Sequence, residues 1–515
     1  MKKNIIFFIG IALMLASCYK DLSTEATMTI PDVQISTTCA DTLLCAFGDS
    51  LVIHPEIYQE GRSEDNFTYI WEMDLQPGKA SDRVELGTGK NLDYLVRNTP
   101  STIPYIVSLI VTDTETGYAV VKKWVVYVSS SLGEGVVVGH TRDGGNTSEL
   151  DLVRSKKVTY GYTSDEGHVT RNLYMVGNND TMEGRVNCIS AMCGSDGATY
   201  NREFLMVGTD KHLLGLDIST YAVSQSDNAF VTMTEGILNW NTTMVFNFDG
   251  YQFAAVIGGK PFGSNTNMEF QMNAIAGTFS EYTAYKPNSV AYSKMRNAQI
   301  VIWDEDKASF YEVQGWQHAM TGPSQVTSIV FPSSPKGMKS LAAGGGKGNI
   351  LYFVLLFKSG ERYLLGIDDS GYVIGTEFYS LDGCTDIENA ENFCFVDSGN
   401  VFFYSAGQTI YYNIVAGGAV TTRKSLWEIE SPDEKITSIQ PYYQAWYGTH
   451  QYYIEDYEFP LETNRTQILI TTYNEKTGEG KLYIQPFVTS TGRFSEKCEV
   501  YGGFGEITAV GMSTR

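Results

Sequence analysis

The sequence predicts an all-β protein in which a small sandwich is followed by a series of repeated sheets. Its 515 residues include 33 tyrosines and 50 glycines, and Gly, Asn, Asp and Thr separate many short apolar runs. Long helical periodicities are scarce, and short runs rich in aromatic and β-branched residues are typical of strands. An apolar strand, a turn and a second apolar strand recur roughly every 50 residues, which indicates repeated sheets.

The first 17 residues are predicted to be an export signal. Lys2 and Lys3 form a basic start, and an apolar run from Ile5 to Leu15 follows. A helix needs about 20 apolar residues to cross the roughly 30 Å hydrocarbon core of a bilayer, so this run is too short to span it. Residues 1–17 therefore match a signal peptide that is removed from the mature chain.

Leu15-Ala16-Ser17-Cys18 resembles the lipobox of bacterial lipoproteins. The resemblance implies that Cys18 carries a lipid, that the chain is cut just before it, and that residues 18–29 form a tether. An ordinary secretory peptide that happens to contain a cysteine is the alternative. Tyr19-Lys20-Asp21 resembles the tag that sends some lipoproteins across the outer membrane of Gram-negative bacteria. We expect a lipid anchor in the outer membrane with the protein exposed at the cell surface; an anchor that faces the periplasm is the alternative.

Residues 30–130 are predicted to form a small β-sandwich. Its strands are expected at Ser50–Pro55, Phe67–Met73, Tyr105–Asp113 and Ala119–Val128. The Tyr-x-Trp pattern at Trp71, followed by Tyr-x-Val-x-Leu-x-Val-x-Asp, resembles the PKD-like, immunoglobulin-type domain, whose central tryptophan packs between two sheets. The sequence departs from that family at Asp74–Gly78, where an Asp-Gly turn is the rule. We expect Trp71 in the core of the sandwich and not on a ligand surface.

Residues 131–515 are predicted to form a β-propeller, because hairpins recur along this whole region. Each hairpin is an apolar strand followed by a turn and a second apolar strand. The first strands start at Val136, Phe204, Phe253, Ile300, Ile350, Val401 and Ile468. Successive starts lie roughly 50 to 65 residues apart, within the range of propeller blades.

A second recurring element is predicted to be the innermost strand of each blade, since small and β-branched residues suit a strand crowded against a central channel. The candidates are Val186–Ile189, Val231–Ile237, Ser289–Tyr292, Val326–Ile329, Cys384–Ile387, Ile436–Ile439 and Ile507–Val510. Seven inner strands and seven hairpins predict seven blades.

The two ends of this region are predicted to complete one blade. The last inner strand has no hairpin after it, and the first hairpin has no inner strand before it. We therefore predict that Ile507–Met512 pairs in the same sheet as Val136–His140 and closes the ring, which removes open sheet edges. A run of two or three further sandwich domains is the competing architecture.

The charge of the chain argues against some classes of partner. The formal charge is -22, and it becomes -24 when the two lysines Lys2 and Lys3 leave with the signal. Phosphate binding needs clustered Lys and Arg, so nucleic acid is not expected as a partner. Attraction to anionic lipid is equally disfavoured, which leaves the acyl chain as the expected membrane contact.

Seven of the 8 cysteines remain after Cys18 is assigned to the lipid. Cys39 and Cys45 are the best candidates for a disulfide, because they would close a small loop in the sandwich. A chain of this size does not depend on disulfides, and the other cysteines are expected to be mostly buried thiols.

The sequence contains no motif for a metal, a cofactor or catalysis. The 6 histidines have no neighbouring His or Cys at ligand spacing, and Gly344–Gly348 lacks the spacing and the following Ser or Thr of a phosphate loop. A glycosidase needs two carboxyl groups roughly 5 to 9.5 Å apart. Asp304–Asp306 and Asp368–Asp369 lie where hairpin turns belong, and turns favour Asp. We expect turn residues there, and neither metal nor cofactor.

An aromatic segment between the strand at Ile436 and the hairpin at Ile468 is the candidate ligand-binding site. Flat rings offer large contact area and stack on sugars or pack against peptides. Their concentration in a connecting segment favours binding, and an extra hairpin with a packed aromatic face is the alternative. The candidate residues are Tyr442, Tyr443, Trp446, Tyr447, His450, Tyr452 and Tyr453.

The order of lipobox, PKD-like domain and propeller-like body resembles the PKD-like lipoproteins of Gram-negative nutrient uptake systems, which pair a TonB-dependent channel with a lipoprotein lid. The resemblance covers the whole chain. It implies a non-catalytic accessory protein that captures glycan or oligopeptide, or docks onto the channel and its lid. A propeller glycoside hydrolase or lyase is one alternative, and a structural or adhesion docking platform is another.

Overall fold

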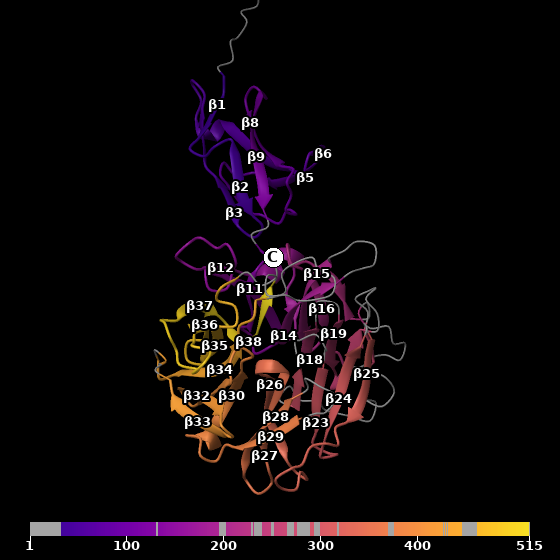
Figure 1. The fold of residues 1–515 in the computed structure, drawn as a ribbon. Coiled ribbons are helices and arrows are strands. Elements are labelled where there is room, and N and C mark those ends of the chain that lie inside the picture. The colour runs from indigo at the N-terminus through magenta and orange to yellow at the C-terminus, as the bar shows by residue number, and fades with distance from the viewer. Residues whose placement is uncertain are drawn as a thin grey trace, which may run out of the picture. The chain divides into compact units, whose positions relative to one another are not determined.

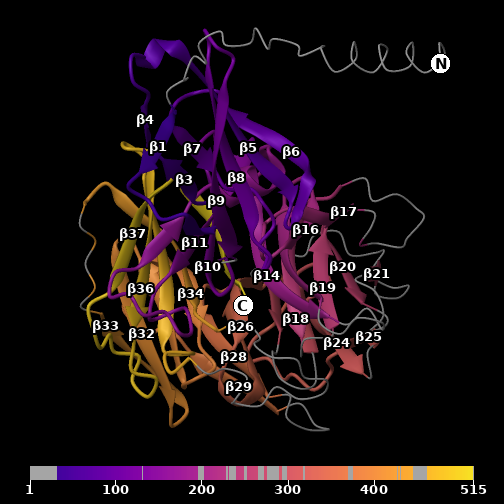
Figure 2. The same ribbon diagram turned by 90° about the horizontal axis from the view of Figure 1, so that it is seen from above.

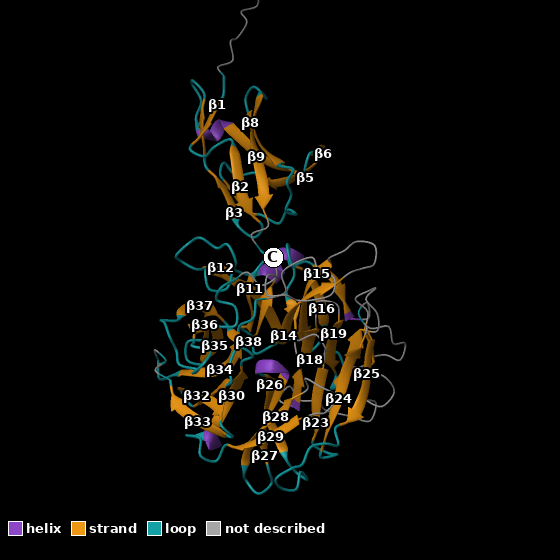
Figure 3. Ribbon diagram, viewed as in Figure 1, coloured by secondary structure: helices purple, strands orange, loops and turns teal. Residues whose placement is uncertain are grey.

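The structure is a computed structural model, and it is built almost entirely of strands (Figure 3). It describes residues 32–129, 132–194, 202–227, 230, 239–248, 252–264, 272–274, 289–292, 299–316, 319–368, 375–425, 427, 429, 431–444 and 461–513. Within these ranges there is one α-helix, α2 (Leu173–Asn178). No helix among the described residues is long and apolar enough to cross a membrane. Cys18 and the signal lie outside these ranges.

The chain divides into two compact units. The first consists of residues up to 43, together with 51–94 and 105–126, and the second of the remaining residues. The strands of the N-terminal region are β1 (Gln34–Thr37), β2 (Thr42–Ala46), β3 (Ser50–Ile53), β4 (Pro55–Tyr58), β5 (Phe67–Gln76), β6 (Lys79–Gly87), β7 (Leu92–Leu95), β8 (Tyr105–Asp113) and β9 (Ala119–Ser129). They form a five-stranded sheet in the order β2-β9-β8-β5-β6 and two pairs, β1-β4 and β3-β7.

The four strands predicted in the N-terminal region are confirmed as β3, β5, β8 and β9. Trp71 on β5 and Trp124 on β9 are fully buried, and their ring centroids lie 5.3 Å apart. The Nε1–H group of Trp71 donates a hydrogen bond to the Gly89 carbonyl at 2.9 Å. The prediction that Trp71 is a core residue is therefore confirmed, and its polar group is satisfied inside the core.

The second unit contains seven antiparallel sheets of at least four strands each. The first consists of β38 (Glu506–Ser513), β10 (Gly135–Thr141), β11 (Thr147–Arg154) and β12 (His168–Thr170), with β13 (Met182–Glu183) paired to β11. The second and third are β14 (Val186–Gly194), β15 (Arg202–Thr209), β16 (Leu213–Asp217) and β17 (Val223–Ser226), then β18 (Thr242–Phe248), β19 (Gln252–Ile257), β20 (Lys260–Ser264) and β21 (Met272–Ala274).

The remaining four sheets follow in chain order. The fourth and fifth are β22 (Val290–Tyr292), β23 (Gln299–Asp304), β24 (Ser309–Trp316) and β25 (Ala319–Gln325), then β26 (Lys339–Gly345), β27 (Ile350–Leu356), β28 (Arg362–Asp368) and β29 (Gly375–Ser380). The sixth and seventh are β30 (Ala390–Phe395), β31 (Val401–Ala406), β32 (Thr409–Ala416) and β33 (Ala419–Lys424), then β34 (Glu434–Pro441), β35 (Gln467–Asn474), β36 (Glu479–Pro486) and β37 (Glu499–Phe504).

These sheets contact one another in a closed ring (Figures 1 and 2). The inner strand β14 contacts the inner strands β38 and β18 of its two neighbouring sheets. In the same way β22 contacts β26, β26 contacts β30, and β30 contacts β34. Contacts of β20 with β25 join the third and fourth sheets, and those of β35 and β36 with β38 join the seventh to the first. Apolar side chains fill the space between neighbouring sheets, for example Val138 of the first sheet with Leu469 and Ile484 of the seventh.

The predicted closure of the ring is confirmed. β38 pairs with β10 along its whole length, with Ser513 opposite Gly135, Val510 opposite Val138 and Ile507 opposite His140. In Figure 1 the yellow strand β38 lies among the magenta strands that begin the ring. The two ends of this region therefore complete one sheet, in which β38 covers β10 and takes the innermost position.

The inner strands share a β-bulge that ties neighbouring sheets together. In six of the seven sheets the pairing of the inner strand with the next strand shifts by a residue or two near its beginning. Two of the bulged residues are asparagines whose Nδ2 groups reach the following sheet. Asn187 donates to the Thr242 carbonyl at 3.2 Å and Asn392 to the Ile436 carbonyl at 3.3 Å. The bulge aims a side chain out of its own sheet.

All seven predicted hairpin starts lie in the second strand of a sheet, from β10 to β35. Four of the predicted inner strands are also found, at β14, β22, β34 and β38. Two are wrong: Val326–Ile329 and Cys384–Ile387 lie in connections, and the inner strands of those sheets are β26 and β30. Val326 and Ile387 are buried within these connections, which explains why their sequence looks like a strand. Val231–Ile237 lies outside the described residues.

The predicted disulfide between Cys39 and Cys45 is wrong, because both thiols are free. The backbone of each residue is held by another partner: the Cys39 carbonyl accepts from the Thr37 hydroxyl at 3.2 Å, and the Cys45 carbonyl accepts from the Ser129 hydroxyl at 3.3 Å. Cys188, Cys384, Cys394 and Cys498 are also free. Burial raises the pKa of the Cys188 thiol to about 12, which keeps it protonated and unreactive.

Candidate functional site

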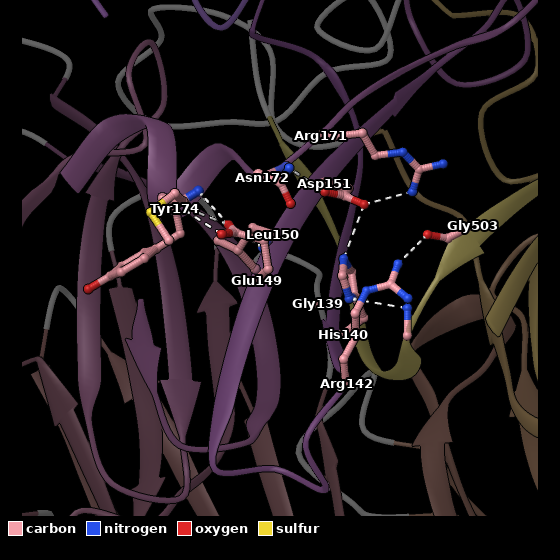
Figure 4. Close-up of polar contacts among 12 residues, drawn as sticks. Gly139, His140, Arg142, Glu149, Leu150, Asp151, Arg171, Asn172, Tyr174 and Gly503 are labelled. Carbon is pink, nitrogen blue, oxygen red and sulfur yellow. Dashed lines mark hydrogen bonds and ion pairs between the residues drawn. The ribbon is translucent and has the colours of Figure 1, made fainter. Parts of the chain in front are cut away.

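A polar cluster lies where the last sheet meets the first (Figure 4). His140 on β10 and Asp151 on β11 belong to the first sheet, and Arg171 follows β12. They face the end of β37, which includes Gly503 and leads into β38. Among the described residues of the second unit, His140 and Asp151 are the buried histidine and the buried aspartate.

Both ring nitrogens of His140 are occupied. Its Nε2 atom lies 3.1 Å from Asp151 Oδ2, and its Nδ1 atom accepts a hydrogen bond from the Gly505 N–H group at 3.3 Å. Because Nδ1 accepts, we place the proton on Nε2, where it is donated to the carboxylate. His140 is 4% exposed. No nitrogen is left to take a proton from a substrate, so this pair holds the chain and does not act as a general base.

Asp151 is the centre of the cluster and is 1% exposed. Its Oδ1 atom accepts from the Asn172 N–H group at 2.8 Å, and its Oδ2 atom accepts from Arg171 Nη1 at 2.8 Å. Burial alone would raise the pKa of this carboxyl, but the hydrogen bonds from His140, Asn172 and Arg171 outweigh it and hold the pKa below its ordinary value.

Two arginines connect this cluster to the end of β37. Arg171 Nη2 donates to the Gly502 carbonyl at 2.5 Å, and its guanidinium lies 4.4 Å from the centre of the Phe504 ring. Arg142 Nη2 donates to the Gly503 carbonyl at 2.6 Å. The first sheet therefore clamps the end of β37, which leads into the closing strand β38. This clamp stabilises the closed ring.

Glu149, two residues before Asp151 on β11, meets the beginning of α2. Its Oε1 atom accepts from the N–H groups of Leu150 at 2.9 Å and Tyr174 at 2.7 Å. The free N–H groups of a helix N-terminus favour a carboxylate. Burial raises the pKa of Glu149 in spite of these hydrogen bonds.

Glu434 on β34 is a second buried carboxylate whose oxygens are occupied. Its Oε1 atom accepts from the hydroxyl of Tyr483 at 2.8 Å and from that of Thr472, and its Oε2 atom lies 3.2 Å from Lys481 Nζ. Burial alone would raise its pKa, but these three groups outweigh burial and lower it. A buried carboxylate with these partners stabilises its own sheet.

The turn predicted at Asp304–Asp306 is found. Asp304 ends β23, residues 305–308 form the following turn, and Asp304 Oδ1 accepts from the Lys307 N–H group at 2.9 Å. Asp368 ends β28, and Asp369 lies outside the described residues. In the part of the chain that the structure describes, no three His, Cys, Asp or Glu side chains are grouped to hold a metal ion.

The glycine run at Gly344–Gly348 has a packing role. A side chain at Gly344 would lie 2.8 Å from the Phe395 ring, and one at Gly346 would lie 2.2 Å from the Tyr352 ring. These two rings stack on each other with centroids 5.7 Å apart. The run therefore lets an aromatic pair approach the backbone, and Gly344 and Gly345 belong to β26.

Tyr442 is a core residue, which corrects its prediction as a ligand-binding residue. It is 1% exposed, and its hydroxyl donates to the Val158 carbonyl at 3.2 Å. Burial raises its pKa well above the ordinary value. Tyr443 is half-buried. The other candidates of the aromatic segment lie outside the described residues: Trp446, Tyr447, His450, Tyr452 and Tyr453.

The residues on either side of the aromatic segment are hydrogen-bonded to each other. Gln444 Oε1 accepts from the Leu461 N–H group at 3.0 Å, and Asn464 Oδ1 accepts from the Gln444 N–H group at 2.8 Å. The Nε2 group of Gln444 donates to Glu134 Oε1 at 2.7 Å. Gln444 and Leu461 therefore lie side by side, and Gln444 is fixed to Glu134, the residue before β10.

Comparisons with known proteins find similarity of structure alone. No family model matches the chain, and no curated protein matches it. A quinonprotein alcohol dehydrogenase-like protein from Bacteroides thetaiotaomicron is 13% identical, with 93% of this chain and 99% of that chain covered and a TM-score of 0.47. Apo AztD from Citrobacter koseri is 7% identical, with 87% and 99% covered and a TM-score of 0.34.

The WD40 domain of SCAP from fission yeast is a third similar structure. It is 9% identical, with 58% of this chain and 70% of that chain covered and a TM-score of 0.35. Similarity at this level decides nothing about activity or ligands, which rest on the residues of the chain itself.

Proposed function

We propose that this protein is a lipid-anchored, non-catalytic component of a TonB-dependent uptake system at the outer membrane. Its lipid would be attached to Cys18, and its ring would capture a glycan or oligopeptide or dock onto the channel. We propose further that the seven sheets are the blades of a seven-bladed β-propeller and that the first unit is a PKD-like, immunoglobulin-type domain. The lipobox and the order of the two units support this proposal.

The state of the buried carboxylates favours binding over hydrolysis. Asp151 and Glu434 each accept hydrogen bonds from at least three groups of the protein, and His140 has no free nitrogen. Glycoside hydrolysis needs a carboxylic acid and a second carboxylate that both reach the substrate. Carboxylates that are saturated inside the fold do not meet that need.

The observation that carries a binding role is the fixed base of the aromatic segment. Connecting segments carry binding residues more often than the elements that they connect, and this one is rich in Trp and Tyr. Gln444 joins its two flanks and ties them to Glu134. A binding segment held at its base loses less conformational freedom when a ligand binds.

Replacing both Trp446 and Tyr447 by Ala is expected to weaken ligand capture by about tenfold or more, because each ring supplies contact area to the ligand. The protein should stay folded, because the core clusters of the described residues include neither ring. A screen of glycans and oligopeptides identifies what the wild type binds, and titration calorimetry compares the variant. Tyr442→Phe is the matched control, since it removes only a buried hydroxyl. Unchanged affinity in the double variant would remove the segment from the binding site.

A further inference from the structure

The connection between β11 and β12, residues 155–167, is long for a loop of this ring. The equivalent connections in the second and sixth sheets are shorter, residues 218–222 and 417–418, and that in the seventh sheet, residues 487–498, is similar in length. It contains turns but neither helix nor strand. Loops of this length in compact domains usually carry a function.

The loop is fixed to the last sheet. The Val158 carbonyl accepts from the Tyr442 hydroxyl at 3.2 Å, and the Lys157 carbonyl accepts from the Thr463 hydroxyl at 2.8 Å. The Thr159 hydroxyl donates to the Glu134 carbonyl at 3.3 Å. Residues 157–159 are therefore held at three points, and the turn that follows them is presented from a rigid base.

Two tyrosines flank a glycine at this turn. Tyr160 is 44% exposed. The hydroxyl of Tyr162 donates to the Glu166 carbonyl at 3.1 Å, and the guanidinium of Arg154 lies 5.9 Å from the centre of its ring. Gly161 has a φ of +72°, and no atom lies within 4 Å of the position that a side chain there would occupy. The space beside Gly161, between two aromatic residues, is open.

The charges of the loop cancel. Lys156 Nζ lies 2.5 Å from Asp165 Oδ1, and Lys157 Nζ lies 3.4 Å from Glu496 Oε2. Residues 155–167 contain two lysines, Asp165 and Glu166, so their formal charge is zero, in a chain of charge -22. A neutral surface on an acidic protein does not select a polyanion or a polycation.

We propose that Tyr160, Gly161 and Tyr162 form a stacking surface for a residue of a neutral polysaccharide. The apolar face of a sugar ring packs on an aromatic ring, and Tyr162, whose hydroxyl is already bonded to the Glu166 carbonyl, loses little entropy on binding. The open space at Gly161 leaves room for the sugar ring. The neighbouring Thr163 and Ser164 are exposed, and their hydroxyls suit a ligand rich in hydroxyl groups.

This inference names a ligand class for the proposed function and rests on it, but it uses a different part of the ring from Trp446 and Tyr447. A broad apolar docking face for a protein partner would need a larger exposed apolar area than two tyrosines supply. The polar surroundings of the turn therefore favour a saccharide over an apolar peptide.

Native gel electrophoresis in gels that contain laminarin, xylan or mannan tests the proposal, with alginate as a polyanion. The wild type is expected to be retarded by at least one neutral polysaccharide and not by alginate. Tyr160→Ala is expected to weaken retardation about tenfold, and Tyr162→Phe, which keeps the ring, is expected to retain it. Tyr58→Ala is the matched control, because Tyr58 is 62% exposed in the N-terminal region.

Three results would overturn the proposal: no retardation by any neutral polysaccharide, retardation that Tyr160→Ala leaves unchanged, or binding of a tryptic peptide digest through Tyr160 in place of a polysaccharide. Thermal melting of each variant shows that it is folded, and the exposed Tyr160 carries the test if a variant of Tyr162 is unstable. Failure of the uptake role would appear as the absence of a channel in co-purification, and would leave the retardation unchanged.

Discussion

A chain that stops at Gly505 is expected to lose the cooperative folding of the ring. The missing residues include β38, which pairs with β10 along its whole length and buries Ile507 and Val510 between the first and last sheets. Without it β10 becomes an open, apolar edge. We expect a loss comparable with the entire free energy of unfolding of a domain, about 5–15 kcal/mol.

Circular dichroism melting and size-exclusion chromatography measure this loss. A chain that stops at Ser513 is the matched control, because it keeps every residue of β38 and should melt as the full chain does. The shorter chain should be aggregated or show no cooperative transition of the ring. A cooperative transition at the temperature of the full chain would contradict the role of β38 in closing the ring.

Asp151→Ala is expected to cost about 3 kcal/mol of the free energy of unfolding. The change removes the acceptor for three donors, namely His140 Nε2, Arg171 Nη1 and the Asn172 N–H group. The Nε2–H group of His140 is then a buried donor without a partner. Arg171, which donates to the Gly502 carbonyl of β37, loses the carboxylate that neutralises its charge. Urea unfolding at pH 7 gives the difference from the wild type.

The matched control is Asp165→Ala, because Asp165 also pairs with a basic side chain but is 94% exposed. It should have little effect on the free energy of unfolding, because water screens an exposed ion pair. The pKa of Asp151 lies below its ordinary value, so its contribution is fully present above about pH 4 and is lost as the pH falls through the lowered pKa. The cost of Asp151→Ala should therefore be constant from about pH 5 to 8 and shrink below pH 4; a cost equal to that of Asp165→Ala would contradict the clamp.

The sequence predicts the second strand of each sheet well, because these strands are buried on both faces. Phe204–Val207 and Ile350–Phe357 are continuous apolar runs for this reason. The inner strands β26 and β30 are missed because the connections before them, Val326–Ile329 and Cys384–Ile387, have the composition that the prediction looked for. Val326–Ile329 has the right composition, but it is a connection that buries one apolar side chain.

The polar cluster and the burial of Tyr442 could not be predicted from the sequence, because their hydrogen-bond partners are far away along the chain. Tyr442 bonds to Val158, 284 residues earlier, and His140 to Gly505, 365 residues later. The available signal is weak: His140 and Asp151 stand in otherwise apolar strands, which indicates a buried polar partner. Ring closure itself is predictable, since the unmatched hairpin and the unmatched strand can be counted.

The central claim, that the protein is an anchored component of an importer, is tested most directly by purifying the tagged full chain from detergent-solubilised outer membranes and identifying its partners by mass spectrometry. We predict that a TonB-dependent channel and its lid lipoprotein co-purify with the wild type, and that Cys18→Ser leaves the membrane fraction and loses both. Purification of the acylated protein without a channel would contradict the claim, as would a Cys18→Ser variant that stays in the membrane with its partners unchanged.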